Sequence, residues 1–224
     1  SSQLFSKSRW EDWVEPVYEE YNALISLGFE HIYLCACSTG ATLLLHGLNQ
    51  KHFRPSLPIK HIILVDPLLH LKQRLFYFLP YLKLLIKDVK TPLTDDENNH
   101  WLPIKPLSTL LQLGRLLKQT TSLLKFGISC SSHIAFSVFQ AKDDPVINRQ
   151  SVLDIYNGIL KKSPVKINVS VVSSAKHVFT RLAGRTDVTG ADIDLQRRVF
   201  KKILGLCDAS CTGFSYTDSS DASL

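Results

Sequence analysis

The segment from Ile32 to Ala41 constrains the fold of this chain more than any other. An apolar run, Ile-Tyr-Leu-Cys-Ala-Cys, leads directly into Ser38. This pattern predicts a buried strand that passes through one tight turn into a helix. The small residues two positions before and after the serine, Ala36 and Gly40, fit such a turn, because bulky side chains there would collide with adjacent strands.

A serine in a turn of this kind is a candidate nucleophile. Its strained backbone would project the hydroxyl group from the carboxyl edge of a sheet, at the N-terminus of a helix whose free N–H groups can stabilise an oxyanion. The usual pattern is Gly-x-Ser-x-Gly, and here Ala36 replaces the first glycine. By itself, the segment is also compatible with a purely structural strand-to-helix junction.

The remainder of the chain alternates between strand-like and helix-like segments. We expect strands at 31–36, 61–65, 133–139 and 166–172, and helices ending near Gly28 and covering about 39–48, 150–161 and 192–204. Strands of near-continuous apolar character separated by helices indicate an α/β fold, with a mostly parallel sheet covered by helices on both faces.

Two regions depart from this alternation. The interval of about 68–129 is rich in leucine and aromatic residues and has no strand signal, so we expect an inserted helical lid there. Residues 207–224 are rich in Ser, Asp and Thr, and we expect a disordered tail. The predicted folded domain is therefore 1–206.

Two loops supply the other residues that a nucleophilic serine needs. Asp144 follows the third predicted strand, and His177 follows the fourth. The order Ser, acid, His, each at the carboxyl end of a strand, suits a base that takes the serine proton and a carboxylate that fixes its tautomer. Asp143 and Asp66, which ends the second strand, are alternative acids, and His177 could instead be an ordinary surface histidine.

Composition limits the classes of function. The chain has 224 residues with 45% hydrophobic and 21% charged residues, which suits one globular core. The net charge of +6 indicates a solvated basic surface or, alternatively, contact with an anionic membrane, and no nucleic-acid-binding signature is present. The five cysteines have no zinc-site spacing, so we interpret them as buried, reduced thiols of a cytoplasmic protein and expect no metal.

These motifs together resemble the monoacylglycerol lipase and carboxylesterase group of α/β-hydrolases, the serine-aminopeptidase-like group. The resemblance extends from Trp10 to about Leu204 and is carried by the serine turn, by Trp10 and Trp13, by the segments 140–144 and 155–157, and by His177. It implies hydrolysis of carboxylic esters, with monoglycerides as one candidate, without cofactor or metal. It also places the acid at Asp144.

The sequence before Trp10 differs from that of this group, whose members have further strands and a His-Gly loop in the corresponding N-terminal part. In the group, that loop supplies one oxyanion-hole N–H, and the resemblance assigns the other to Thr39. Here the N-terminal part of the sheet is missing from the sequence, and we expect a piece of a longer chain. A non-catalytic relative that binds lipids or partners is the alternative.

The predicted lid bears on the substrate. The segment 75–82 is apolar and aromatic, with Lys72, Arg74, Lys83 and Lys87 around it. These residues could simply cover the core. They also suit an acyl chain and peripheral contact with an anionic membrane. We therefore expect a small-molecule ester, with a lipid-like ester as a candidate, and no nucleic-acid partner.

Overall fold

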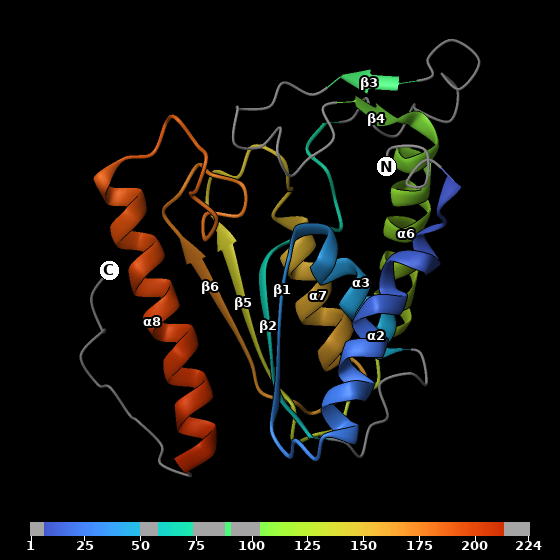
Figure 1. Ribbon diagram of the computed structural model, residues 1–224, viewed down its shortest axis with the longest axis vertical. Coiled ribbons are helices and arrows are strands. Elements are labelled where there is room, and N and C mark those ends of the chain that lie inside the picture. The colour runs from blue at the N-terminus through green and yellow to red at the C-terminus, as the bar shows by residue number, and fades with distance from the viewer. Residues whose placement is uncertain (1–6, 50–57, 74–87, 91–103, 213–224) are drawn as a thin grey trace.

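The computed structural model describes residues 7–49, 58–73, 88–90 and 104–212. Its centre is a sheet of four parallel strands in the order β1-β2-β5-β6 (Figure 1). The strands are β1 (Ile32–Cys37), β2 (Ile59–Pro67), β5 (Ala135–Ala141) and β6 (Ile167–Val172). The predicted parallel sheet is confirmed, although the third strand begins and ends two residues later than expected.

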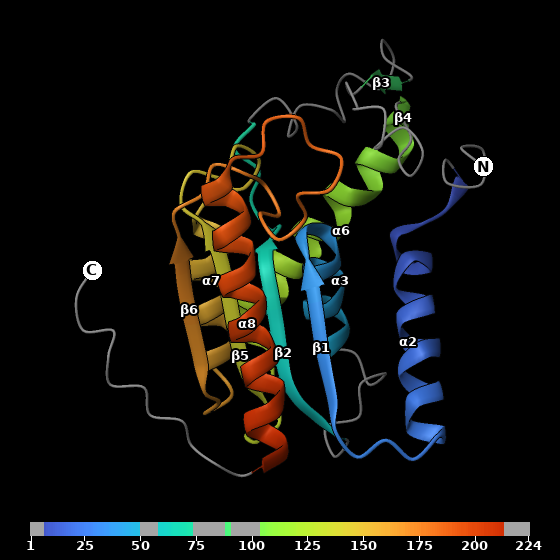
Figure 2. The same cartoon turned by 60° about the vertical axis from the view of Figure 1, so that its left-hand side comes forward.

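Helices cover both faces of the sheet. On one face lie α2 (Trp10–Ser26), α3 (Ser38–Leu48), α6 (Leu107–Phe126) and α7 (Gln150–Leu160), whereas α8 (Gly190–Thr212) lies on the other (Figures 1 and 2). The central strands are buried on both faces, which explains why their sequences are almost continuously apolar instead of alternating.

Each face has its own hydrophobic core. The larger core joins the four-helix face to the sheet, with Leu45, Ile62, Leu124, Phe136 and Ile155 among its fully or nearly fully buried members. The smaller core lies under α8, where Val199 packs with Ile63, Val65 and Phe139. None of the helices that the structure describes has the length and apolar character needed to cross a bilayer.

The predicted lid differs from the structure in two ways. First, β3 (Asp88–Lys90) and β4 (Ile104–Pro106) form an antiparallel ribbon, although no strand was expected in that part of the sequence. Second, α6 packs against α3 and α7, and Leu116 and Leu124 are buried, so the part of the predicted lid that forms α6 belongs to the core layer. The predicted apolar lid segment 75–82 lies outside the described residues.

Two smaller predictions are also corrected. Helix α8 continues to Thr212, so residues 207–212 are helical where we expected a tail to begin, and 213–224 lie outside the described residues. The thiols of Cys35, Cys37, Cys130 and Cys207 are free as expected, but Cys35 and Cys37 are exposed. They point to the α8 side of β1, which is an edge strand of the described sheet, whereas Leu34 and Ala36 face the larger core.

The contact between α6 and α7 depends on a glycine. A Cβ atom at Gly158 would lie 2.7 Å from the backbone oxygen of Leu124, a contact that the rigid helix backbone cannot relieve. We therefore expect Gly158→Ala to lower the free energy of unfolding by about 1–3 kcal/mol, as in other overpacked cores. Chemical denaturation measures the change.

Gly205→Ala is the matched control for this prediction. Gly205 also lies in a helix, but a Cβ there meets no atom within 4 Å. Alanine favours the helix over glycine by about 1 kcal/mol, so this variant is expected to be neutral or slightly more stable. If the two substitutions have equal effects, close packing at Gly158 is not the cause.

Candidate active site

Ser38 lies at the point where β1 passes directly into α3. Its φ of 49° places it in the left-handed region, the strained conformation that the sequence pattern predicts. Ser38 forms a parallel bridge with Pro67, and its carbonyl oxygen accepts the N–H of Leu68 at 3.2 Å. The hydroxyl of Thr42 also donates to the carbonyl oxygen of Leu68. The end of β2 therefore fixes the serine turn in place.

The steric reason for the small residues around Ser38 is only partly supported. Ala36 is partly buried and packs against the larger core, where its methyl group fits. A Cβ at Gly40, by contrast, would have no neighbouring atom within 4 Å. Among the described residues, nothing crowds the second position, so the expected collision is absent at Gly40.

The three residues singled out in the sequence form one chain of hydrogen bonds. The Oγ of Ser38 lies 2.9 Å from the Nε2 of His177, and the Nδ1 of His177 lies 2.9 Å from the Oδ2 of Asp144. All three follow the carboxyl ends of strands, because Ser38 follows β1, Asp144 follows β5 and His177 follows β6. Figure 2 shows the long loop between β6 and α8 lying over this end of the sheet.

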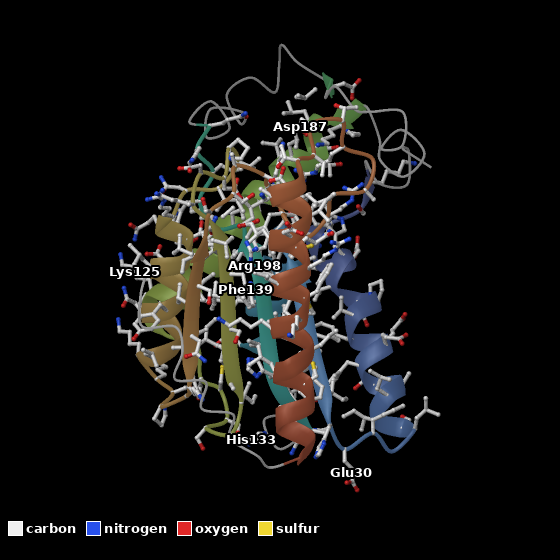
Figure 3. All side chains as sticks on the ribbon, turned by 90° about the vertical axis from the view of Figure 1, so that its left-hand side faces the viewer. Glu30, Lys125, His133, Phe139, Asp187 and Arg198 are labelled. Atoms are coloured by element: carbon white, nitrogen blue, oxygen red, sulfur yellow. The ribbon has the colours of Figure 1, made fainter. Side chains whose placement is uncertain are left out.

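The same end of the molecule carries Asp187, while Glu30 and His133 mark the opposite end (Figure 3). Asp187 pairs with Lys176, the neighbour of the histidine, and the guanidinium of Arg185 donates to the carbonyl oxygen of His177. The loop that presents His177 is thus braced by its own charged residues. Neither Arg185 nor Asp187 was identified as relevant in the sequence, since a charge pair within one loop has no distinctive spacing.

The environment of Asp144 keeps its carboxylate ionised. Burial alone would raise its pKa, but the hydrogen bond and positive charge of His177 and the N–H groups of Ile147 and Val146 together lower it. Those two N–H groups donate to Oδ1 at 2.9 and 2.7 Å, which leaves Oδ2 for the histidine. The carboxylate is only 1% exposed, so its orientation is fixed.

The alternative acids occupy different environments. The side chain of Asp143 is 64% exposed and pairs with Arg149 at 3.5 Å. Asp66 is fully buried at the end of β2, where burial chiefly raises its pKa to about 6. Its carboxylate accepts backbone N–H groups, whereas the hydrogen bond to His177 comes from Asp144. The geometry therefore pairs Asp144 with the histidine.

Backbone strain is concentrated at this site. Three non-glycine residues in the described part of the chain have positive φ: Ser38 (49°), Asp66 (43°) and Val178 (51°). A β-branched residue such as Val178 is especially unfavourable in this region. Strained residues persist where the surroundings over-determine them, and they cluster at functional sites. Nothing in the sequence around Val178 marked it as strained.

The first turn of α3 begins at Ser38 itself. Thr39, assigned by resemblance as an oxyanion-hole donor, follows Ser38 in this turn. The first N–H groups of a helix have no acceptor within it, and they carry the positive end of the helix dipole. The place of Thr39 in the first turn is compatible with an oxyanion-hole donor, and this role stays a prediction.

Asp66, Asp144 and His177 also form the one group among the described residues close enough to hold a metal ion. One ligand atom from each lies within 4.8 Å of the others. However, both carboxylates already accept backbone N–H groups, and His177 bridges Asp144 and Ser38. These oxygen and nitrogen atoms already take part in hydrogen bonds within the protein, and we continue to expect no metal.

Comparisons with known proteins find similarity at the level of structure but none at the level of sequence. No protein-family model matches the sequence, and no curated protein is significantly similar to it. Solved structures do match. One is from the work on LipS and LipT, two metagenome-derived lipolytic enzymes, with a TM-score of 0.67 and 16% identity over 92% of this chain and 77% of that chain. This chain has an α/β-hydrolase fold.

Other α/β-hydrolase neighbours are named as lipases of monoglycerides. A soluble variant of monoglyceride lipase from Saccharomyces cerevisiae, in complex with a substrate analog, has a TM-score of 0.62 and 13% identity over 88% of this chain and 68% of that chain. Monoacylglycerol lipase from Paleococcus ferrophilus has a TM-score of 0.56 and 10% identity over 86% and 76%. Identities this low establish the shared fold, in agreement with the resemblance seen in the sequence.

Proposed function

We propose that this chain is a serine hydrolase that cleaves carboxylic esters through an acyl-enzyme on Ser38. The observation that carries the proposal is the continuous chain of hydrogen bonds from the Ser38 hydroxyl through His177 to Asp144, with 2.9 Å at each step. The strained serine turn at the N-terminus of α3 supports the same role.

The mechanism follows from the positions of these atoms. His177 Nε2 takes the proton of Ser38 as the Oγ attacks the ester carbonyl, and the resulting oxyanion lies near the first turn of α3, where Thr39 N–H donates to it. The imidazolium then protonates the leaving alcohol. Water, activated by the same histidine, releases the acid and regenerates the serine. Asp144 holds the tautomer that leaves Nε2 free to accept.

The substrate is proposed to be a small ester, and a lipid-like ester such as a monoacylglycerol is the leading candidate. Two structural neighbours are named as monoglyceride or monoacylglycerol lipases, and the sequence of 75–82 is apolar enough to accompany an acyl chain. The basic residues around that segment suit peripheral contact with an anionic membrane. A cytoplasmic location stays a prediction.

Covalent labelling tests the proposed nucleophile. A fluorophosphonate probe reacts with a serine that is activated by an adjacent base. The folded protein is expected to form one adduct, located on Ser38 by peptide mass spectrometry, and Ser38→Ala is expected to abolish it.

Ser131→Ala is the matched control, because the structure contains a second serine–histidine contact. The Oγ of Ser131 lies 2.7 Å from the Nδ1 of His133, at the exposed opposite end of the sheet (Figure 3). Labelling should persist in this variant. A folded protein that stays unlabelled, or one labelled equally after Ser38→Ala, would favour the non-catalytic binding protein instead.

A further inference from the structure

Asp66 is a buried carboxylate that takes no direct part in the proposed reaction. It is 0% exposed and has a φ of 43° at the end of β2. Burying a carboxylate is costly unless hydrogen-bond donors compensate for the lost water. A residue that combines burial, charge and backbone strain beside a reactive serine is a candidate for a functional role.

The hydrogen bonds of Asp66 join two of the loops that form the site. Its Oδ1 accepts the N–H of Ala141 at 2.7 Å and the side-chain amide of Gln140 at 3.1 Å. Its Oδ2 accepts the N–H of Phe179 at 3.4 Å. Ala141 ends β5 shortly before the proposed acid, and Phe179 lies just beyond the proposed base. One carboxylate thus connects the acid-bearing strand to the histidine loop.

The residues that follow Asp66 reach the third loop. Pro67 bridges to Ser38, and the N–H of Leu68 donates to the carbonyl oxygen of Ser38. The end of β2 therefore contacts the backbone on which the nucleophile, the acid and the base all depend. A displacement of Asp66 would be transmitted to each of them.

Asp66 also contributes charge close to the histidine. One carboxylate oxygen of Asp66, one of Asp144 and a ring nitrogen of His177 lie within 4.8 Å of one another. Burial and then the charge of Asp144 raise the pKa of Asp66 to about 6, opposed by the N–H of Ala141 and by His177. A further titratable neighbour is Cys37, whose pKa is raised by partial loss of contact with water and by the charge of Asp66.

We propose that Asp66 is a positioning residue for His177: it ties the loop of the base to the end of β5 and places a second carboxylate beside the imidazole. This inference rests on the proposed function, since it concerns the same base. An ionised Asp66 favours the imidazolium that forms as Ser38 attacks, because the two charges attract in a buried environment. The protonated form lacks this effect.

Asp66→Asn tests the inference with little disturbance of the backbone. Asparagine tolerates positive φ, and its carbonyl oxygen can still accept from Ala141, whereas its NH2 group cannot accept the N–H of Phe179. With a p-nitrophenyl ester, kcat per fluorophosphonate-reactive site at pH 8 is expected to fall about 10-fold, which corresponds to about 1.4 kcal/mol, with KM unchanged. The acidic limb of the rate profile should also move to lower pH. That midpoint does not depend on how much of the protein is folded.

Thermal unfolding gives a readout that does not require turnover. The carboxyl group of Asp66 has a raised pKa, so its contribution to stability is fully present below about pH 4 and is lost as the pH rises through about 6. Asparagine does not ionise. The difference in Tm between Asp66→Asn and the unaltered protein should therefore be more favourable to the variant at pH 8 than at pH 5.

Asp143→Asn is the control, since it removes an exposed carboxylate that pairs with Arg149 and is expected to leave kcat, the pH midpoint and the Tm difference unchanged. Turnover that depends on Ser38 but has the same kcat and acidic limb after Asp66→Asn would overturn the role of Asp66 and leave the proposed function intact. If Asp66→Asn changed the Tm by the same amount at both pH values, the role of Asp66 would be packing and not positioning. Turnover that is absent or independent of Ser38 would instead overturn both proposals.

Discussion

Replacing Ser38 with alanine is expected to reduce the turnover of a p-nitrophenyl ester by about 10⁶-fold, to near the rate without nucleophilic catalysis. Loss of the nucleophile from a serine–histidine–aspartate arrangement has an effect of about this size. In the proposed mechanism the hydroxyl oxygen of Ser38 attacks the ester, and this oxygen lies 2.9 Å from His177 Nε2. Initial rates at pH 8, corrected for background hydrolysis, measure the change.

The fold should survive this substitution. The contacts that hold the turn are made by the Ser38 backbone, through Pro67 and Leu68, so the side chain contributes little to them. Alanine does keep the unfavourable positive φ, so circular dichroism and thermal unfolding are needed to verify folding. Undiminished turnover by folded Ser38→Ala would defeat the assignment of the nucleophile.

Asp144→Asn is expected to lower kcat by about 10⁴-fold while leaving the fold intact. An amide at this position can donate to Nδ1 of His177 and select the tautomer whose Nε2 carries the proton, and that tautomer cannot accept a proton from Ser38. The amide oxygen can still accept the N–H groups of Val146 and Ile147. A full pH–rate profile of kcat, with folding verified by thermal unfolding, measures the effect.

The neighbouring Asp143 supplies the control for this prediction. Asp143→Asn removes the same charge one residue away, but from a carboxylate that is largely exposed, and turnover should change by less than about 3-fold because exposed charge pairs contribute little. If both variants lose activity equally, net charge in the loop matters and the orientation of His177 by Asp144 does not. Loss in Asp143→Asn alone would reassign the acid.

The lowered pKa of Asp144 and the raised pKa of Asp66 have opposite consequences for stability. Asp144 contributes stability that is present above about pH 4 and is lost as the pH falls, because the native state holds its carboxylate ionised. Asp66 has the opposite effect: its contribution to stability is lost as the pH rises from about 4 to 6 and its carboxyl group ionises. Two buried carboxyl groups beside one histidine are thus kept in different protonation states at mildly acidic pH.

Much of the fold could be predicted from the sequence, because its signals are local. Apolar runs marked β1, β2 and β5, alternating apolar residues marked β6, and the junction at Ser38 predicted the strained turn that the backbone adopts. Local signals failed where tertiary contacts dominate. The leucine-rich sequence of α6 resembled a lid, but its second half is buried against α3 and α7. The strands of the β3–β4 ribbon have three residues each, which is too short to show an alternating apolar pattern.

The order of the four sheet strands along the chain, and the residue types that follow each strand end, could be predicted from local patterns. Which aspartate contacts the histidine, and which one joins the loops instead, followed only from contacts between distant segments. Ser38 and His177 are 139 residues apart in the chain, and Asp66 and Phe179 are 113 apart. Periodicity reports which face of an element is buried. Hydrogen-bond partners at such separations are set by strand register and loop geometry, which no local pattern encodes.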